Sequence, residues 1–261
     1  MMLYGQEHYL GEKTMTTKTA LICEKYELPV IEGEVKKVEG EGRALGYYEY
    51  INARTLETGK NLLCVEHLLQ MLPKGLSVIE PFGGVGAFSA LIQGQVEPSS
   101  HKIYEIDEPC LNQLKFAFEG KAGVEVAYGN AHEILGTERA DLFVCDFPFM
   151  TIMRYAEWGA EWKRMTEQNP DAILWMDGAV SYLHLHTENY TKFSGMEVTR
   201  DPLTYANAMS AKLYADTGYS IVATAYSHAC SYFLAKKGAP SEISIVKFPA
   251  GSGEKGYKWI R

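Results

Sequence analysis

Features that define several other protein classes are scarce in this chain or absent from it. It contains only five cysteines in 261 residues, and they include no Cys-x-x-Cys pair. This argues against a disulfide framework and a zinc site, and it is typical of a reducing compartment. No apolar run approaches the roughly 20 residues that cross a bilayer, and the amino terminus has no basic start followed by an apolar core. We therefore expect a cytoplasmic protein without a membrane segment or secretory signal.

Positive charge is also scarce. The chain has 25 basic and 33 acidic residues, giving a formal net charge of −8, which argues against a protein that coats nucleic acid without specificity. The carboxyl-terminal residues 231–261 are an exception, with six basic residues and two acidic ones. This basic cluster is either a solvated tail or a patch that contacts phosphates, and charge alone does not distinguish the two. The basic cluster consists of Lys236, Lys237, Lys247, Lys255, Lys258 and Arg261.

The hydrophobic pattern predicts one α/β domain with an extension before it. A chain of 261 residues, 46% of them hydrophobic, can bury a full core. Residues 1–57 are expected to form an N-terminal extension with short strands, and residues 58–261 the main domain. There, short apolar runs alternate with helical periodicity, which predicts a three-layer α/β fold with a mainly parallel sheet. The predicted strands cover 76–79, 101–105, 124–127, 141–145, 171–176, 219–227 and 242–248, and the predicted helices cover 62–72, 86–93, 109–119, 131–135, 151–168 and 203–216.

The most informative segment follows the first predicted strand of the main domain. That strand ends at Glu80, and glycines follow at positions 83, 84 and 86 before a helix of small residues begins. Glycines let the backbone turn tightly and approach a ligand without a Cβ in the way. A carboxylate here repels a pyrophosphate and attracts an ammonium group. The segment therefore predicts a nucleoside cofactor with a cationic head group.

The segment 80–86, with the sequence Glu-Pro-Phe-Gly-Gly-Val-Gly, resembles the Glu/Asp-Pro-Phe-x-Gly-x-Gly motif of class I methyltransferases that act on exocyclic amino groups of nucleobases. The resemblance implies S-adenosyl-L-methionine as the cofactor, because this molecule carries an α-ammonium group and a sulfonium. It also implies a Rossmann-like methyltransferase fold with an antiparallel last strand, which residues 219–227 or 242–248 could supply. The implied cofactor contacts are Glu80, Phe82, Gly83, Gly84 and Gly86.

An acidic side chain also ends the second predicted strand. Glu105 lies 22 residues after Gly83, close to the spacing at which dinucleotide-type folds place an acid on ribose hydroxyls. Its two oxygens match two vicinal hydroxyls, so Glu105 is predicted to bind the ribose, with Ile106 beside it in the cofactor pocket. Asp107 has two interpretations, because it could belong to this site or cap the helix that begins near Pro109.

The third predicted strand leads into Gly129-Asn130-Ala131. This resembles the Gly-Asp-Ala turn of the same family, whose acid contacts the adenine amino group. Asn130 replaces the acid but keeps an amide oxygen that can accept a hydrogen bond. Asn130 and Ala131 are therefore candidate cofactor contacts, and an equally open alternative is that Asn130 caps a helix.

The fourth predicted strand leads into Asp146-Phe147-Pro148-Phe149, which resembles the Asp/Asn-Pro-Pro-Tyr/Phe signature of the amino-group methyltransferases. The resemblance implies that Asp146 borders the cofactor and that its carboxylate and the Phe147 carbonyl hold the substrate amine toward the methyl group. Phe149 would stack on the base. Phe147 replaces the first proline of the signature, but its carbonyl is retained, and Pro148 still favours an extended backbone before it.

The spacing of the motifs limits the architecture. Glu80 and Asp146 are 66 residues apart, which leaves no room for a target-recognition domain between them and resembles ribosomal RNA guanine-N2 methylases. Residues 178–202 are rich in tyrosine and histidine, so they are either a substrate lid at the cofactor end of the sheet or an ordinary packed insertion. We expect no metal site at His184 and His186, because such a pair in an irregular segment is more often hydrogen-bonded at the surface.

These observations predict an S-adenosylmethionine-dependent N-methyltransferase whose acceptor is an exocyclic amino group of a nucleobase in DNA or RNA. The acidic net charge keeps a second acceptor class open, namely a small molecule or a protein amide nitrogen. A third interpretation is a non-catalytic subunit that keeps the fold and has lost methyl transfer through Phe147.

Overall fold

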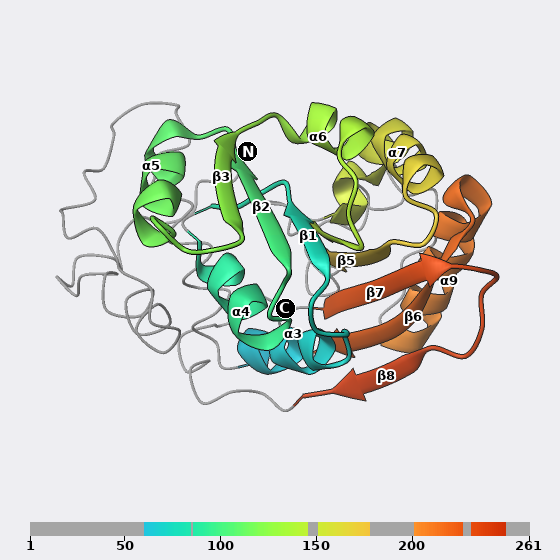
Figure 1. The fold of residues 1–261 in the computed structure, drawn as a ribbon. Helices are drawn as coiled ribbons and strands as arrows, with labels where there is room; N and C mark the ends of the chain where they lie inside the picture. Colours follow the sequence, from blue (N-terminus) through green and yellow to red (C-terminus); the bar gives the residue numbers. More distant parts are fainter. Residues whose placement is uncertain (1–59, 85, 146–150, 178–200, 227–230, 249–261) are drawn as a thin grey trace, which may run out of the picture.

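Helices and strands alternate along the chain (Figure 1). The computed structural model describes residues 60–84, 86–145, 151–177, 201–226 and 231–248. The helices are α3 (Lys60–Gln70), α4 (Ala87–Gln95), α5 (Glu108–Ala117), α6 (Ala131–Thr137), α7 (Thr151–Gln168) and α9 (Pro202–Thr217). The strands are β1 (Ser77–Glu80), β2 (Ser100–Glu105), β3 (Val124–Tyr128), β4 (Leu142–Cys145), β5 (Ile173–Asp177), β6 (Tyr219–Tyr226), β7 (Ser231–Lys237) and β8 (Ser244–Lys247). The strands and helices predicted for residues 62–248 are confirmed, each to within two residues at its ends.

The described strands form one sheet in the order β3-β2-β1-β4-β5-β7-β6-β8. Parallel pairs join β1 to β2 and to β4, β2 to β3, β4 to β5, and β6 to β8. Among these strands β7 alone runs antiparallel, between β5 and β6. The prediction of a mainly parallel sheet that includes an antiparallel strand is therefore confirmed.

The position of the antiparallel strand differs from the expectation. It is formed by residues 231–237, for which no strand was predicted, whereas β8, within the predicted run 242–248, is parallel to β6. The apolar part of β7 is short and ends in Lys236 and Lys237, so the local pattern is weak evidence for a strand. Tertiary pairing with two neighbours overrides this weak local signal.

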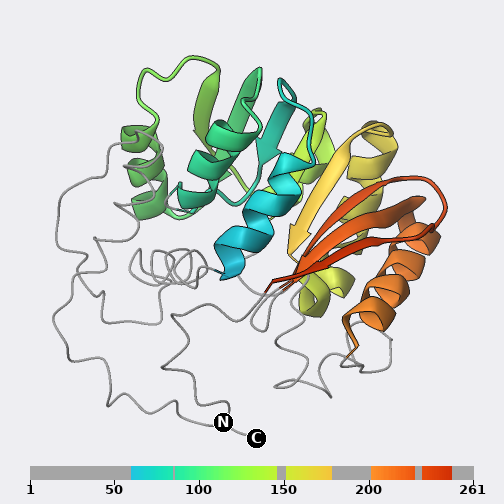
Figure 2. The ribbon, with the colours of Figure 1, turned by 90° about the horizontal axis from the view of Figure 1, so that it is seen from below.

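Helices cover both faces of the sheet and make three layers (Figure 2). On one face, Leu68 of α3 and Leu91 of α4 pack in one cluster with Trp175 of β5, and α5 covers β2 on the same side. On the other face, Trp162 of α7 packs in a cluster with Phe143 of β4. All four residues of β4 are buried, as expected for a parallel strand covered on both faces.

The parallel strands point in one direction, so their carboxyl ends lie along one edge of the sheet. We call this the carboxyl edge; it contains Glu80, Glu105, Tyr128 and Cys145, the last residues of β1 to β4. The opposite amino edge contains the first residues of the same strands. The described residues of the motifs predicted to bind the cofactor lie at this edge or directly after it in sequence.

The sheet separates the lysines of the basic cluster. Lys237 pairs with Tyr219 at the start of β6, so Lys237 and the neighbouring Lys236 lie at the amino edge. Lys247 pairs with Tyr226 at the end of β6 and lies at the carboxyl edge. Both edges therefore carry positive charge, and among the basic-cluster residues that the structure describes, Lys247 alone shares an edge with the glycine turn.

Within the described ranges, no helix has the length and apolar character needed to cross a membrane. The same residues contain no group of three or more His, Cys, Asp and Glu side chains that could hold a metal ion. The predicted extension at 1–57 and residues 178–200 of the predicted lid lie outside the described residues. Of the predicted lid, Asp201 is the N-cap of α9 and accepts a hydrogen bond from the Thr204 N–H at 2.8 Å, and Pro202 is the first residue of that helix.

Candidate functional site

The turn after β1 lies directly over the end of β2. The Gly83 N–H donates to the Tyr104 carbonyl at 2.9 Å. A Cβ at Gly83 would stand 2.4 Å from Ile103 Cγ2 and 2.7 Å from Leu114 Cδ1. These separations are well below the roughly 3.5–4 Å of an ordinary carbon contact. The packing of the turn against β2 and α5 therefore requires glycine at this position.

Two further glycines shape the turn through their backbone angles. Gly84 has a φ of 54° and Gly86 a φ of 93°, both in the left-handed region that favours glycine. Gly86 is also the N-cap of α4, so the unpaired N–H groups of the first helical turn lie beside the glycines. The three glycines predicted to bind the cofactor thus form one tight turn at the carboxyl edge.

Glu105 closes this turn from the neighbouring strand. Its side chain is 6% exposed, and its Oε2 accepts from the Gly84 N–H at 2.8 Å. Its Oε1 accepts from the N–H groups of Ile106 and Asp107 at 2.7 and 2.8 Å. Burial raises the pKa of Glu105 above its ordinary value, while these backbone hydrogen bonds act in the opposite direction. A carboxylate offers about four acceptor positions, so Glu105 can accept from a further donor.

Two exposed side chains border Glu105. Ile106 is 52% exposed and Tyr128 is 66% exposed, and Tyr128 pairs with Glu105 in the register between β2 and β3. A buried acid beside exposed apolar and aromatic side chains can hold a ligand that carries hydroxyl groups next to a flat ring. The ribose contact of Glu105 and the cofactor contact of Ile106 stay predictions.

Glu80 ends β1 with no exposed surface. Its Oε2 accepts from the Ser89 hydroxyl of α4 at 2.6 Å and lies 3.1 Å from His101 Nε2 of β2. Its Oε1 is buried and has no hydrogen-bond partner among the described residues. Leaving a buried acceptor unpaired costs about 1–3 kcal/mol, and more for a charged group. The glycine turn and this oxygen together fit a cofactor with a cationic group near the end of β1.

Asn130 is the N-cap of α6. Its Oδ1 accepts from the His132 N–H at 3.1 Å, which confirms the capping interpretation, and Ala131 behind it is buried. The amide oxygen has a second lone pair, so its contact with an adenine amino group stays a prediction. Gly129 before the cap has no room for a side chain, because a Cβ there would lie 2.6 Å from Tyr104 Cδ1.

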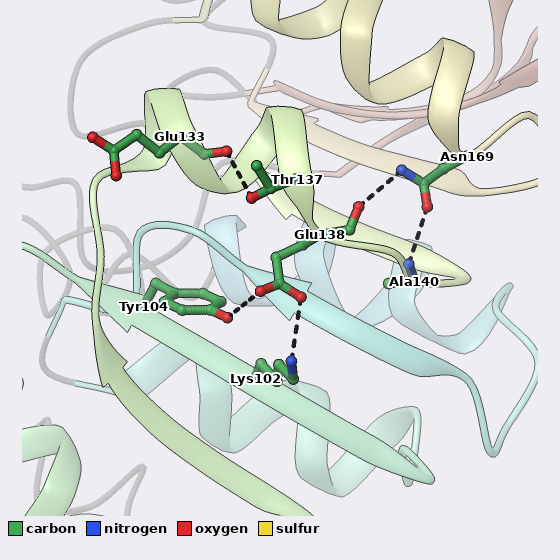
Figure 3. A network of polar contacts seen from close by, with 7 residues as sticks. All are labelled: Lys102, Tyr104, Glu133, Thr137, Glu138, Ala140 and Asn169. Atoms are coloured by element: carbon green, nitrogen blue, oxygen red, sulfur yellow. Dashed lines mark hydrogen bonds and ion pairs between the residues drawn. The ribbon is translucent and has the colours of Figure 1, made fainter.

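A polar network holds the far end of α6 (Figure 3). The Glu138 carboxylate accepts from the Tyr104 hydroxyl at 2.6 Å and from Lys102 Nζ at 3.3 Å. Asn169, which follows α7, donates to the Glu138 carbonyl at 3.1 Å. Burial, followed by the Glu138 carboxylate, raises the pKa of Tyr104 well above its ordinary value. The network thus anchors α6 to β2 and α7 and keeps its amino terminus at the carboxyl edge.

The remaining predicted residues have different outcomes. Phe82 is half-buried and packs against the core cluster on the α6 and α7 face. Asp107 caps α5 by accepting from the Cys110 N–H at 3.3 Å, which confirms the capping alternative. Residues 146–149, predicted to hold the substrate, lie outside the described residues and follow Cys145, the last residue of β4, in sequence.

The partners of Glu80 were not predicted from the sequence. Ser89 and His101 are both fully buried, and no motif marks either of them. The available signal was strand alternation, because His101 shares a face of β2 with Ile103 and Glu105. A histidine at a buried position of a strand requires a polar partner, and the preceding strand offers Glu80.

No protein-family model and no curated protein sequence matches this chain, but solved structures do match its fold. Trm1 from Pyrococcus horikoshii, solved with S-adenosyl-L-methionine, superposes with a TM-score of 0.55 at 13% identity, over 80% of this chain and 62% of Trm1. The O-methyltransferase NcsB1 from neocarzinostatin biosynthesis, solved with S-adenosyl-L-homocysteine and 1,4-dihydroxy-2-naphthoic acid, gives 0.51 at 12% identity, over 73% of this chain and 57% of NcsB1.

A S-adenosylmethionine-dependent methyltransferase from Aquifex aeolicus gives a TM-score of 0.50 at 12% identity, over 74% of this chain and 98% of the other. The chain spans less than two thirds of the length of Trm1 and of NcsB1. At these identities the likeness concerns the fold. The strand order, the glycine turn after β1 and these neighbours show that the chain has the class I S-adenosylmethionine-dependent methyltransferase fold.

Proposed function

We propose that this protein is a S-adenosyl-L-methionine-dependent N-methyltransferase that modifies an exocyclic amino group of a nucleobase in DNA or RNA. The observation that carries the proposal is a pair of buried carboxylates, Glu80 and Glu105, that end neighbouring strands beside the glycine turn. Buried acids with spare acceptor capacity are costly in a protein without a ligand. A ligand that carries both an ammonium group and a ribose diol offsets that cost.

The described residues suit the cofactor part by part. Glu105 accepts from the ribose hydroxyls, Ile106 borders the adenine, and Asn130 Oδ1 accepts from the adenine amino group. Glu80 supplies the negative charge that attracts the α-ammonium group. Because Glu80 is fully enclosed, this attraction acts through an interior of low dielectric, and a direct hydrogen bond to Oε1 requires the glycine turn to move.

S-adenosylmethionine supplies an electrophilic methyl group. The protein must hold the acceptor nitrogen toward that group and stabilise the positive charge that develops on the nitrogen. We assign this role to the Asp146 carboxylate and the Phe147 carbonyl, which accept hydrogen bonds from the amine. Phe149 stacks on the base and fixes its plane.

A small molecule is the second candidate acceptor. The net charge of −8 opposes binding to a phosphate backbone, and Lys236 and Lys237 lie at the edge of the sheet away from the glycine turn. NcsB1, whose fold is similar, was solved with a small aromatic acid. A protein amide nitrogen belongs to the same alternative.

Calorimetric titration with S-adenosyl-L-homocysteine tests the cofactor. We expect the parent protein to bind it and not to bind NAD. Glu80→Ala is expected to weaken binding by about 10–150-fold, the range for a charge-assisted interaction. A parent protein that does not bind S-adenosyl-L-homocysteine, or prefers NAD, would contradict the proposal.

Mass spectrometry of nucleosides tests the acceptor, after DNA and RNA have been incubated with the protein and labelled cofactor. We expect a labelled N-methyl nucleoside. Asp146→Ala is expected to lower the transfer rate by about 100-fold or more while cofactor binding stays near the parent value. Phe147→Pro should keep the rate within about tenfold of the parent, since proline retains the carbonyl.

Other outcomes of the same assay separate the alternatives. Label that appears only in small molecules or in protein supports the second acceptor class. A parent protein that binds the cofactor, methylates no acceptor and gains activity as Phe147→Pro would establish the non-catalytic interpretation.

A further inference from the structure

Two polar side chains, one fully buried and one partly buried, approach Glu80 from β2 and α4. His101 Nε2 lies 3.1 Å from Glu80 Oε2, and Gln93 Nε2 lies 3.0 Å from His101 Nδ1. His101 and Glu80 have no exposed surface. The resemblance that identifies Glu80 does not extend to either partner, because both lie outside the motifs.

The hydrogen-bond directions assign the protons. An amide nitrogen only donates, so Gln93 donates to His101 Nδ1, and the ring proton of His101 lies on Nε2. This proton is donated to Glu80 Oε2. Ser89 donates its hydroxyl to the same oxygen at 2.6 Å, so both donors are on Oε2 and Oε1 receives none from the described residues.

We propose that His101 is a positioning residue for cofactor binding: together with Ser89 it holds Oε2 of Glu80 and leaves Oε1 as the acceptor for the α-ammonium group once the glycine turn has moved. Gln93 sets the tautomer that makes His101 a donor. The inference rests on the proposed function, because it names the ammonium group of S-adenosylmethionine as the partner of Oε1. A carboxylate that is held by two donors loses little freedom when a ligand binds, which is the advantage of a preorganised site.

Two ligands that differ in the amino-acid portion, which carries the α-ammonium group, test this role. S-adenosyl-L-homocysteine carries the α-ammonium group, and 5′-methylthioadenosine has the same adenosine and thioether without the amino-acid portion. The variants are His101→Gln, which keeps a donor near the position of Nε2, and His101→Met, which has similar length and no donor. Binding of both ligands to each protein is measured by calorimetry.

We expect His101→Met to weaken S-adenosyl-L-homocysteine binding by about tenfold, the scale of one hydrogen bond to a charged group. Binding of 5′-methylthioadenosine should stay within about threefold of the parent value, and His101→Gln should restore most of the affinity for S-adenosyl-L-homocysteine. Gln93→Leu should weaken S-adenosyl-L-homocysteine selectively as well, because His101 Nε2 then loses its fixed proton. Gln93 is only partly buried, so this variant tests the inference if His101→Met fails to fold.

Asn169→Ala is the matched control, because Asn169 is also buried and hydrogen-bonded but precedes β5 at the amino edge. It should lower thermal stability and leave the ratio of the two affinities unchanged. Equal losses for both ligands in the His101 and Gln93 variants would show a structural role and overturn the inference. A parent protein that binds 5′-methylthioadenosine as tightly as S-adenosyl-L-homocysteine would also overturn the inference, because the ammonium group would then add no affinity. That result would leave the proposed adenosine contacts unaffected. A parent that binds neither ligand contradicts the proposed function itself.

Discussion

The two edges of the sheet use acidic side chains in opposite ways. At the amino edge, Asp141 Oδ2 accepts from the N–H and the hydroxyl of Ser77 at 2.8 and 2.6 Å. These bonds, the hydroxyl first, lower the pKa of Asp141 below its ordinary value. At the carboxyl edge, burial raises the pKa of Glu105, and Glu80 keeps an oxygen without a partner among the described residues.

The difference follows from exposure and from the surrounding elements. Asp141 is exposed, so water solvates its charge and its bonds to Ser77 join the starts of β1 and β4 with little desolvation cost. Glu80 and Glu105 are enclosed by the glycine turn and by α4, where a charge costs more. An acidic side chain that supports the fold, such as Asp141, is hydrogen-bonded and exposed to solvent. A buried acidic side chain that can accept a further hydrogen bond is suited to a ligand.

The largest expected effect is on cofactor binding at the carboxyl edge. Glu105→Ala removes the acceptor for the ribose hydroxyls and the tie to the Gly84 N–H, so we expect S-adenosyl-L-homocysteine to bind about 10–150-fold more weakly. Calorimetry measures the change. Asp141→Ala, the matched variant at the amino edge, should leave the dissociation constant unchanged. Equal losses in the two variants would remove the distinction between the edges.

A smaller effect, on stability, is expected from Gly83→Ala. The added Cβ meets Ile103 and Leu114, and overpacking of this kind lowers the free energy of unfolding by about 1–3 kcal/mol. Gly159→Ala in α7 is the control, because a Cβ there meets nothing within 4 Å and alanine favours a helix by about 1 kcal/mol. The urea concentration at the midpoint of unfolding should therefore fall in Gly83→Ala and rise in Gly159→Ala. An unchanged midpoint in Gly83→Ala would contradict the packing of the turn on β2.

The pH dependence of stability should separate the edges further. The lowered pKa of Asp141 means that its stabilising contribution is complete above the unfolded-state pKa and is lost as pH falls through the folded-state pKa. The parent should therefore lose more unfolding free energy than Asp141→Asn between about pH 6 and pH 3, by about 0.5–1 kcal/mol. Urea unfolding at several pH values measures the difference.

The contribution of Glu105 to stability is expected to change with pH in the opposite direction to that of Asp141. Its raised pKa means that its contribution is most favourable below the unfolded-state pKa and declines as pH rises through the folded-state pKa. A bound cofactor should reduce that decline, since it supplies a donor to the carboxylate.

For the Asp141 prediction, identical pH profiles of unfolding free energy for Asp141→Asn and the parent would show that the Ser77 contacts do not persist in solution.

The smallest expected effect concerns the lysines. If a nucleic acid binds at the carboxyl edge, replacing Lys236 and Lys237 by alanine should not change the slope of log affinity against log salt. Replacing Lys247, which lies at the carboxyl edge, should reduce that slope by about 0.7–0.9, the value for one phosphate contact. A reduced slope in the Lys236 and Lys237 variant would place the nucleic acid at the amino edge instead.

The capping positions show how far local patterns extend. Asp107 and Asn130 were each open to two interpretations in the sequence, and both cap helices in the structure. A cap depends on a few neighbouring residues, so it can be predicted. Whether the same Asn130 oxygen also meets a ligand depends on what lies across the carboxyl edge, which the local sequence does not contain.

The sequence by itself determined the alternation of strands and helices, the glycine turn and the acids at the ends of β1 and β2. These features arise from hydrophobic period and from backbone angles, which act over a few residues. Only the tertiary structure decided that β7 enters the sheet between β5 and β6, that His101 reaches Glu80, and that Lys236 and Lys237 lie at the amino edge. Each of these depends on pairing between segments far apart in the chain, where register and packing, not local preference, select the partner.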